Sequence, residues 1–269
     1  MDTAKNKSHF LRALLSMEKT YTNVWDSTQS LFGIVEKQFC IEKKWATKFL
    51  EKIQNRYNIL QIWDATTFSY SDIYMDWLTH QLFKQNQDYE KEHFSVRMRK
   101  NHTREIHTFQ IIHTNRQRKS AYHYRPWWVN TPALSNENIM FWNWMYESIT
   151  WKKVPFLPIP TVEVCFQRVI LYSKRRSERL NLDYNFVIHD HKSSKKMPLF
   201  LKNLIIIESK SMDWPSKRLI KEIHKYWWKD ISHMSKFLLA EQTMHQKKLT
   251  KKMKKIIKKN KKLFEISMN

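Results

Sequence analysis

The chain has 269 residues, with 48 lysines and arginines against 25 aspartates and glutamates, for a formal net charge of +23. This length can bury a substantial core, and the positive charge favours a protein that meets a polyanion or an anionic membrane surface. Because Gly33 is the only glycine, the glycine-rich phosphate loops of the Walker and dinucleotide-binding types are excluded. Cys40 and Cys165 lack a CxxC spacing and nearby histidines, which indicates neither a disulfide framework nor a zinc site.

The first part of the chain combines expected helices with short expected strands. Helical spacing of apolar residues predicts helices over residues 7–30 and 42–57. Alternating patterns predict strands over 34–41, 68–76, 93–100, 106–114 and 121–125.

A segment rich in tryptophan and proline, 126–160, precedes a second set of strands and contains a helix expected to begin near Ser135. The second set of strands is predicted over 161–173, 177–188 and 204–211. A helix over 216–228, the segment 231–242 and a lysine-rich end follow. This order predicts an α+β fold in which an antiparallel sheet or barrel is surrounded by helices.

Charged residues recur at alternate positions of three predicted strands, where side chains share a face. They are Arg97 and Arg99, Arg179 and Asp183, and Glu208 and Lys210. In any one strand, such residues usually lie on the solvated face of an ordinary sheet. Three strands of one pattern, one of them opening with four aliphatic residues, favour a barrel with a polar tunnel instead. Arginine suits phosphate oxygens, and a carboxylate among them could hold a divalent cation.

Several short motifs occur in an order that resembles a known family. They are SDIYMD at 71–76, VRMRK at 96–100, FLPIPTVEVCFQR leading to ERLNLD at 156–183, LIIIESKS at 204–211 and HMSKF at 233–237. Their succession is similar to the VTC-type polyphosphate polymerase domain of the triphosphate tunnel superfamily, over about residues 33–239. The resemblance implies an antiparallel β-barrel tunnel surrounded by helices over 31–240. We expect an N-terminal helical extension over 1–30 and a lysine-rich helix or tail over 241–269.

The resemblance also implies an activity, which is the transfer of the terminal phosphoryl group of ATP to a growing polyphosphate chain with Mn²⁺ or Mg²⁺. Carried over by position, the catalytic residues are Lys236, Arg97 and Arg99. The substrate-binding residues are Arg168, Arg179, Ser235, Lys210 and Arg125, and the metal ligand is Glu208. Phosphoryl transfer needs positioning and charge neutralisation more than a covalent step by the protein, so these residue types suit the reaction.

Some positions depart from the family pattern and leave other functions open. Ile34, Gln38, Gln110 and Ile112 stand where the family carries charged tunnel residues. A triphosphate or polyphosphate hydrolase of the same fold is one alternative. The other is a non-catalytic module that binds polyphosphate, inositol phosphates or nucleic acid.

The remaining features concern location and partners. The lysine-rich end predicts either a basic amphipathic helix that meets acidic lipid, polyphosphate or nucleic acid, or a solvated tail. No stretch reaches the length of a membrane-spanning helix, so the expected location is cytoplasmic, with peripheral membrane contact as an alternative. The histidines of HDH at 189–191 are interpreted as residues of a surface loop without a metal.

Overall fold

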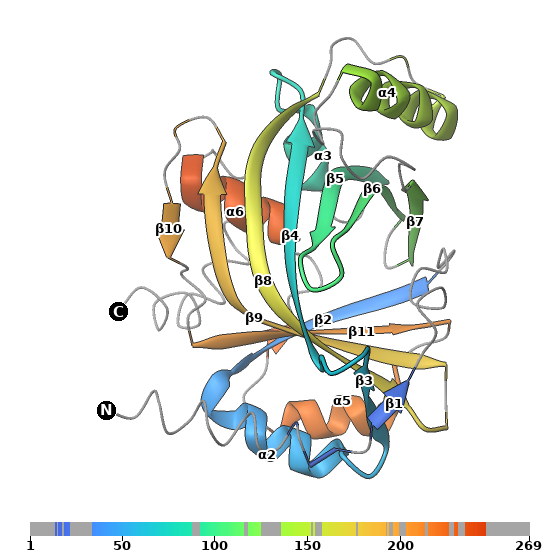
Figure 1. Cartoon of the computed structure of the whole chain (residues 1–269), viewed down its shortest axis with the longest axis vertical. Coiled ribbons are helices and arrows are strands. Elements are labelled where there is room, and N and C mark those ends of the chain that lie inside the picture. Colours follow the sequence, from blue (N-terminus) through green and yellow to red (C-terminus); the bar gives the residue numbers. More distant parts are fainter. Residues whose placement is uncertain are drawn as a thin grey trace.

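The computed structural model describes residues 14, 16–17, 19–21, 34–87, 92–115, 118–124, 136–151, 153, 158–175, 177–191, 193, 196–198, 203–212, 215–225, 229–230 and 235–245. Its elements are shown in Figure 1. They are β1 (Lys19–Tyr21), β2 (Ile34–Glu42), α2 (Lys43–Ile53), β3 (Tyr57–Gln61), β4 (Thr67–Asp76), α3 (Gln81–Asn86), β5 (His93–Asn101), β6 (Ile106–Asn115), β7 (Arg118–Tyr124), α4 (Asn136–Thr150), β8 (Ile159–Ser173), β9 (Glu178–Asp190), β10 (Lys196–Pro198), β11 (Leu204–Ser211), α5 (Lys217–His224), β12 (Lys229–Asp230) and α6 (Lys236–His245).

Within these described ranges, eight strands close into an antiparallel barrel in the order β8-β4-β5-β6-β7-β2-β11-β9, with β9 pairing back to β8. Every neighbouring pair around this ring is antiparallel. Pairing of β8 with β9 closes the ring, so neither strand is left as a free edge of the barrel. The fold is therefore the antiparallel barrel with surrounding helices that the sequence predicted, as expected of a triphosphate tunnel.

Strand β11 shows why an apolar strand ends in a carboxylate and an ammonium. Ile205 and Ile207 face outward and are buried under α2 and α5, in a core shared with β8 and β9. Glu208 and Lys210 face inward, opposite Gln38 and Glu36 of β2. Because helices cover the outer face and the barrel encloses the inner face, the strand is buried on both sides.

Helix α6 fills one end of the barrel interior. Its apolar residues 237–240 are buried in a core with inward-facing side chains of β8, β9, β11 and β2, such as Val164, Ile188 and Ile206. The Phe237 ring stacks on Tyr74 of β4 at 5.2 Å between centroids. This packing holds the first residue of α6, Lys236, at the inner wall of the barrel.

A β-bulge in β9 changes which side chains face outward. Gln167 of β8 pairs with Tyr184, whereas Cys165 pairs with Val187, so β9 has one extra residue between these positions. Asn185 lies at this bulge with φ of 53°, a left-handed conformation that asparagine tolerates better than most residues. Beyond the bulge the alternation is reversed, and His189 faces the outside of the barrel.

Several expected boundaries are corrected by the structure. The helix predicted over 7–30 is wrong at Lys19–Tyr21, which form strand β1 and pair in parallel with β3. The helix predicted over 42–57 ends at Ile53, and Tyr57 begins β3, a strand that the apolar spacing concealed. The helix predicted over 216–228 ends at His224, and 229–230 add to β2 as β12. The short helix α3 was not predicted.

The predicted boundary at 240–241 falls inside α6, where Glu241 is fully buried. The lysine-rich segment beyond His245 and the tryptophan pairs at 127–128 and 227–228 lie outside the described residues. Among the helices that the structure does describe, none has the length and apolar character needed to cross a membrane.

Candidate active site

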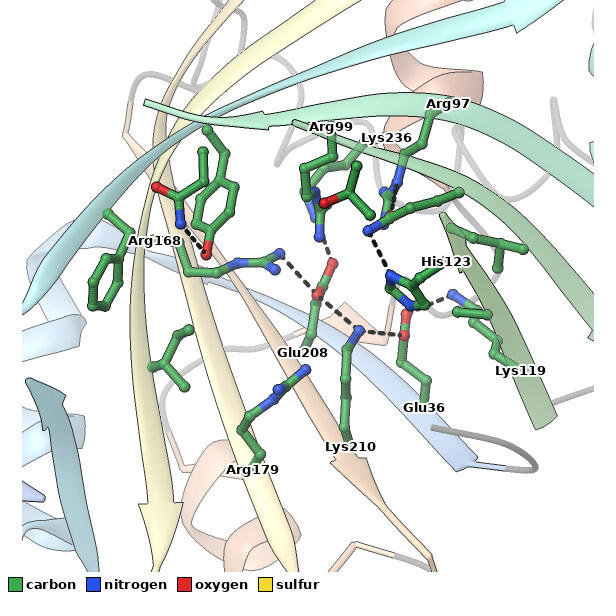
Figure 2. A pocket seen from close by; sticks show the side chains of 18 of the residues that line it. Glu36, Arg97, Arg99, Lys119, His123, Arg168, Arg179, Glu208, Lys210 and Lys236 are labelled. Carbon is green, nitrogen blue, oxygen red and sulfur yellow. Dashed lines mark hydrogen bonds and ion pairs between the residues drawn. The ribbon is translucent and has the colours of Figure 1, made fainter. Parts of the chain in front are cut away.

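The barrel encloses a cavity of about 180 Å³ with a charged wall (Figure 2). Every strand of the barrel contributes to the wall, and α6 contributes one lysine. The cationic lining residues are Arg97, Arg99, Arg104, Lys119, Arg168, Arg179, Lys210 and Lys236. Among the described residues, these eight cations face four buried acids, namely Glu36, Glu208, Asp72 and Asp183. The site therefore has an excess of four positive charges.

Two arginines of β5 share one carboxylate of β4. Asp72 is fully buried and accepts hydrogen bonds from Arg99 at 2.6 and 2.7 Å and from Arg97 at 2.9 Å. Burial raises the pKa of Asp72, but the two guanidinium groups outweigh it and hold that pKa well below its usual range. Gln110 of β6 accepts a further hydrogen bond from Arg97 Nε at 2.8 Å. Both arginines are thus fixed against the cavity wall.

Glu208 is the centre of a second network, which joins β8, β9, β11 and α6. Arg168 donates to Asp183 at 2.6 and 2.7 Å and to Glu208 at 3.1 Å. Lys236 Nζ lies 2.6 Å from Asp183 and also donates to Glu208. Burial raises the pKa of Glu208, but Lys236 and Arg168 outweigh it and lower that pKa far below its usual range. Burial lowers the pKa of Lys236 and of Arg168, yet the carboxylates raise both, so all three groups stay charged.

Two stacked aromatic rings lie against Arg99, Arg168 and Lys236. Tyr70 and Phe166 stack at 5.7 Å between centroids. The guanidinium carbon of Arg168 lies 5.2 Å from the Phe166 centroid, and that of Arg99 lies 5.3 Å from the Tyr70 centroid. Lys236 Nζ lies 5.1 Å from the Phe166 centroid. Such cation–π contacts stabilise a positive charge without an acidic partner. They therefore use none of the N–H donors of the cation, which stay available to a ligand.

Glu36 of β2 joins the third group of charges. Its carboxylate lies 2.5 Å from Lys119 Nζ and 3.2 Å from Lys210 Nζ, and it accepts from Gln38 at 2.7 Å. Burial raises the pKa of Glu36, but Lys119 and Lys210 outweigh it and lower that pKa to about 2. Burial lowers the pKa of Lys210 to about 8, with Arg179 and Arg168 adding to the effect against the opposing carboxylates.

The pair Glu36 and Glu208 provides the oxygen donors that a divalent cation needs. Lys210 Nζ lies between them, 3.2 Å from a Glu36 oxygen and 3.9 Å from a Glu208 oxygen (Figure 2). A cation of similar position would meet two carboxylates, and Mg²⁺ and Mn²⁺ favour such oxygen ligands together with water and phosphate. These two carboxylates would therefore suit the expected metal, and Lys210 is the cation that now lies between them.

Arg179 of β9 points into the cavity beside Lys210 (Figure 2). It makes no ion pair with any acid of the described residues, and its buried Nε has no hydrogen-bond partner there. Arg179 is half-buried, so water screens its charge only in part, and a bound anion would supply the missing counter-charge. Arg179 is therefore a candidate position for contact with an anionic ligand.

The structure brings together most of the residues that the sequence singled out. Seven line the cavity, namely Arg97, Arg99, Arg168, Arg179, Glu208, Lys210 and Lys236. Ser235 is not among the cavity-lining residues, and its hydroxyl caps α6 by accepting from the Leu238 N–H at 3.1 Å, so its expected contact with substrate stays a prediction. Arg125 lies outside the described residues.

Other members of the site were not assigned from the sequence. Asp72, Glu36 and Lys119 are needed to complete the ion pairs described above, and only cross-strand register reveals them. In the sequence, the alternation of Ile34, Glu36 and Gln38 indicated that Glu36 shares a strand face with two other tunnel positions, but it did not indicate which cations Glu36 would meet. The substituted positions Ile34, Gln38, Gln110 and Ile112 all line the cavity, so the departures from the family pattern lie at the site itself.

Neither a protein-family model nor a curated protein matches this sequence. Solved structures are similar at low identity. A protein of Pyrococcus horikoshii OT3 aligns with a TM-score of 0.42 and 10% identity, over 77% of this chain and 99% of its own. A Hippeastrum protein, described as an adenylyl cyclase with a dominant triphosphatase activity, gives 0.46 and 10%, over 78% and 96%. A Bacillus halodurans protein named as an adenylate cyclase gives 0.39 and 10%, over 72% and 88%.

Proposed function

We propose that this protein is a metal-dependent polyphosphate polymerase, which transfers the terminal phosphoryl group of ATP to a growing polyphosphate chain inside the barrel. The excess of four positive charges in the enclosed cavity is the observation that carries the proposal. A triphosphate carries roughly four negative charges near neutral pH, so its charge matches that excess. The resemblance of the sequence motifs to the VTC type names the reaction within this class.

The side chains divide the work of phosphoryl transfer by position. Arg97 and Arg99, held by Asp72, would bind phosphate oxygens through planar forks that are already oriented. Lys236 and Arg168 would neutralise charge that develops on the transferred group. Their acidic partners keep them charged, because the carboxylates raise the pKa of both cations. Arg179 would gain a phosphate where it now has no acid partner among the described residues.

A divalent ion would be held by Glu208 and Glu36, with Mn²⁺ or Mg²⁺ as the expected metals. When bound, such an ion supplies charge neutralisation for neighbouring phosphate oxygens. The protein's own contribution is the fixed ring of arginines and lysines, which positions the chain and limits the space for water.

Hydrolysis of a triphosphate or of polyphosphate is the second candidate, and one observation favours it. Helix α6 fills one end of the barrel interior with apolar side chains. A chain that grows beyond the cavity must then leave through the remaining opening, whereas a short triphosphate fits as it is. In the polymerase the end of the polyphosphate chain accepts the phosphoryl group. If water accepts it instead, the same site acts as a hydrolase.

The deciding experiment incubates the full-length protein with ATP and Mn²⁺ and resolves the products on a gel stained for polyphosphate. Free phosphate is measured in parallel. The polymerase produces a ladder, and the hydrolase releases phosphate without one. Tight binding of ATP with neither product would favour the non-catalytic binding module and overturn the proposal.

Variants connect the result to the cavity. Arg179→Ala removes a cation without breaking an ion pair of the described residues, so it should lower activity at unchanged stability. Lys236→Ala should abolish the product, and circular dichroism checks its folding because it breaks a buried network. Arg218→Ala, an exposed arginine of α5, is the matched control and should behave as the unaltered protein.

A further inference from the structure

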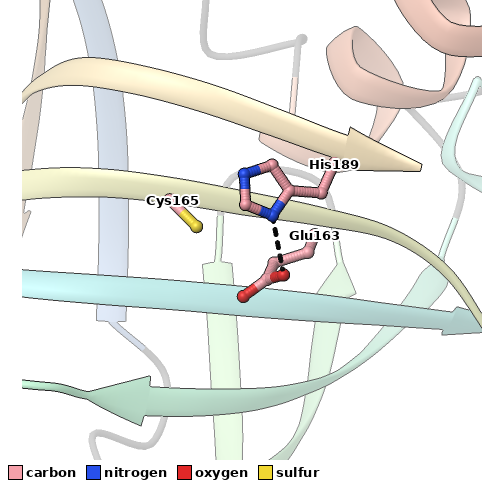
Figure 3. Close-up of side chains that lie close together, drawn as sticks. All are labelled: Glu163, Cys165 and His189. Atoms are coloured by element: carbon pink, nitrogen blue, oxygen red, sulfur yellow. Dashed lines mark hydrogen bonds and ion pairs between the residues drawn. The ribbon is translucent and has the colours of Figure 1, made fainter. Parts of the chain in front are cut away.

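The outer face of the barrel carries a cluster of metal-ligating side chains that the cavity chemistry does not use. Glu163 and Cys165 of β8 and His189 of β9 lie close together, with their ligand atoms all within 4.8 Å of one another (Figure 3). His189 Nδ1 lies 3.2 Å from a Glu163 carboxylate oxygen. His191 Nε2 lies 3.9 Å from the same oxygen. Each side chain is half-buried, so the group is accessible from solvent.

The barrel register places these residues on one face. Glu163 pairs directly with His189 across the two strands, and Cys165 lies two residues along β8, on the same side. The backbone N–H of His191 donates to the Thr161 carbonyl, so the same pairing continues one step further. Without the extra residue at Asn185, His189 would face the tunnel instead. The bulge is therefore what creates the cluster.

We propose that Glu163, Cys165, His189 and His191 form a binding site for a zinc ion on the outside of the barrel. A thiolate, imidazoles and a carboxylate are the ligand types that Zn²⁺ takes in a four-coordinate site. Zinc bonds of about 2.0–2.3 Å place tetrahedral ligand atoms roughly 3.3–3.8 Å apart. The ligand atoms of Glu163, Cys165 and His189 lie within 4.8 Å of one another and would move closer to reach this geometry, and His191, 3.9 Å from the Glu163 carboxylate oxygen, would supply the fourth ligand.

The chemistry of this cluster differs from that of the cavity. The carboxylates in the cavity suit a hard cation such as Mg²⁺, whereas sulfur and nitrogen donors select zinc. The second cysteine, Cys40, is buried, and burial, with Glu42 nearby, raises the pKa of its thiol to about 12. Its thiolate is therefore not offered to a metal at neutral pH. A bound zinc ion would cross-link β8 and β9 where the barrel closes.

The test adds Co²⁺, as a spectroscopic substitute for zinc, to the metal-free full-length protein. We expect one equivalent to produce a thiolate-to-cobalt charge-transfer band, which Zn²⁺ then displaces. Cys165→Ser should remove the band, and His189→Ala should weaken the affinity by about tenfold or more, because even the loss of groups that only orient ligands costs roughly 10–100-fold. His224→Ala, on the exposed side of α5, is the matched control and should change nothing.

A second measurement does not depend on the variants folding. Zn²⁺ should slow the labelling of Cys165 by a thiol reagent in the unaltered protein. It should also raise the Tm of the protein, because a ligand that binds the native state stabilises that state. The absence of a charge-transfer band together with unprotected labelling would overturn the proposal. An undiminished band in Cys165→Ser would overturn it as well.

Discussion

Single buried carboxylates allow the fold to enclose several arginines and lysines, because each carboxylate supplies a counter-charge. Asp72 illustrates this, because one fully buried carboxylate compensates two arginines. Removing one partner of such a group leaves buried charge unpaired, which is more destabilising than the pair itself is stabilising. The residues that we propose to bind a substrate therefore belong to the same network that stabilises the barrel.

Asp72→Asn should lower the free energy of unfolding by about 3 kcal/mol at pH 7, because both arginines lose their counter-charge. The folded-state pKa of Asp72 is lowered, so its contribution is present above the unfolded pKa of about 3.9 and is lost as the pH falls below that value. Denaturant unfolding at a series of pH values measures the difference between the two proteins.

That difference should shrink as the pH falls below about 4. A difference that stays constant down to pH 3 would show that the charge of Asp72 is not its cause. The exposed Asp64 provides the control, since Asp64→Asn should leave stability unchanged at every pH.

Among the elements, β9 has two roles that the bulge separates. Before the bulge, Arg179 and Asp183 face the cavity, and after it His189 faces outward. Asn185 makes this possible with a backbone conformation that β-branched residues avoid. Its side chain also donates to Gln167 and accepts from Lys43, at the exposed surface.

Asn185→Val should destabilise the protein by about 1–2 kcal/mol, because a β-branched residue in the left-handed region is strained. Asn185→Gly keeps that conformation accessible and should cost clearly less. Thermal unfolding of both variants measures the two effects. Equal losses would assign the role to the side-chain hydrogen bonds of Asn185 instead of to its backbone.

At the scale of the whole molecule, the charge of +23 acts differently from the charge in the cavity. Exposed lysines attract any polyanion at long range, and salt screens them. Most charged groups of the cavity are at least half-buried and are held by fixed partners, so salt affects them less.

Binding of tripolyphosphate should therefore depend less on salt than binding of duplex DNA, which contacts only the outer surface. Titrations between about 50 and 200 mM salt compare the two slopes. Arg179→Ala should weaken tripolyphosphate binding and leave DNA binding unchanged. Equal slopes, with DNA binding also weakened in Arg179→Ala, would place both ligands on one surface and favour a nucleic-acid-binding function.

Much of this arrangement follows from local sequence. The period of two in 93–100 and 204–211 places Arg97 with Arg99, and Glu208 with Lys210, on one face of their strands without any tertiary information, and barrel closure makes that face the inner one. The sequence did not predict Asp72 or Glu36 as partners of these cations, because cross-strand register is set by barrel closure. Asp76, which ends the SDIYMD motif, accepts from the backbone of Leu82 and Phe83 and so fixes α3 instead of lining the cavity.

The sequence by itself determined a basic, strand-rich chain with charged residues on buried faces, because composition and alternation are local properties. Only the tertiary structure decided which acid neutralises which cation and which arginine lacks a partner, because these depend on register and closure. It also decided that Cys165, Glu163 and His189 meet, although 26 positions separate Glu163 from His189 in the chain. A single extra residue in β9 reverses the alternation there, and no local pattern encodes that reversal.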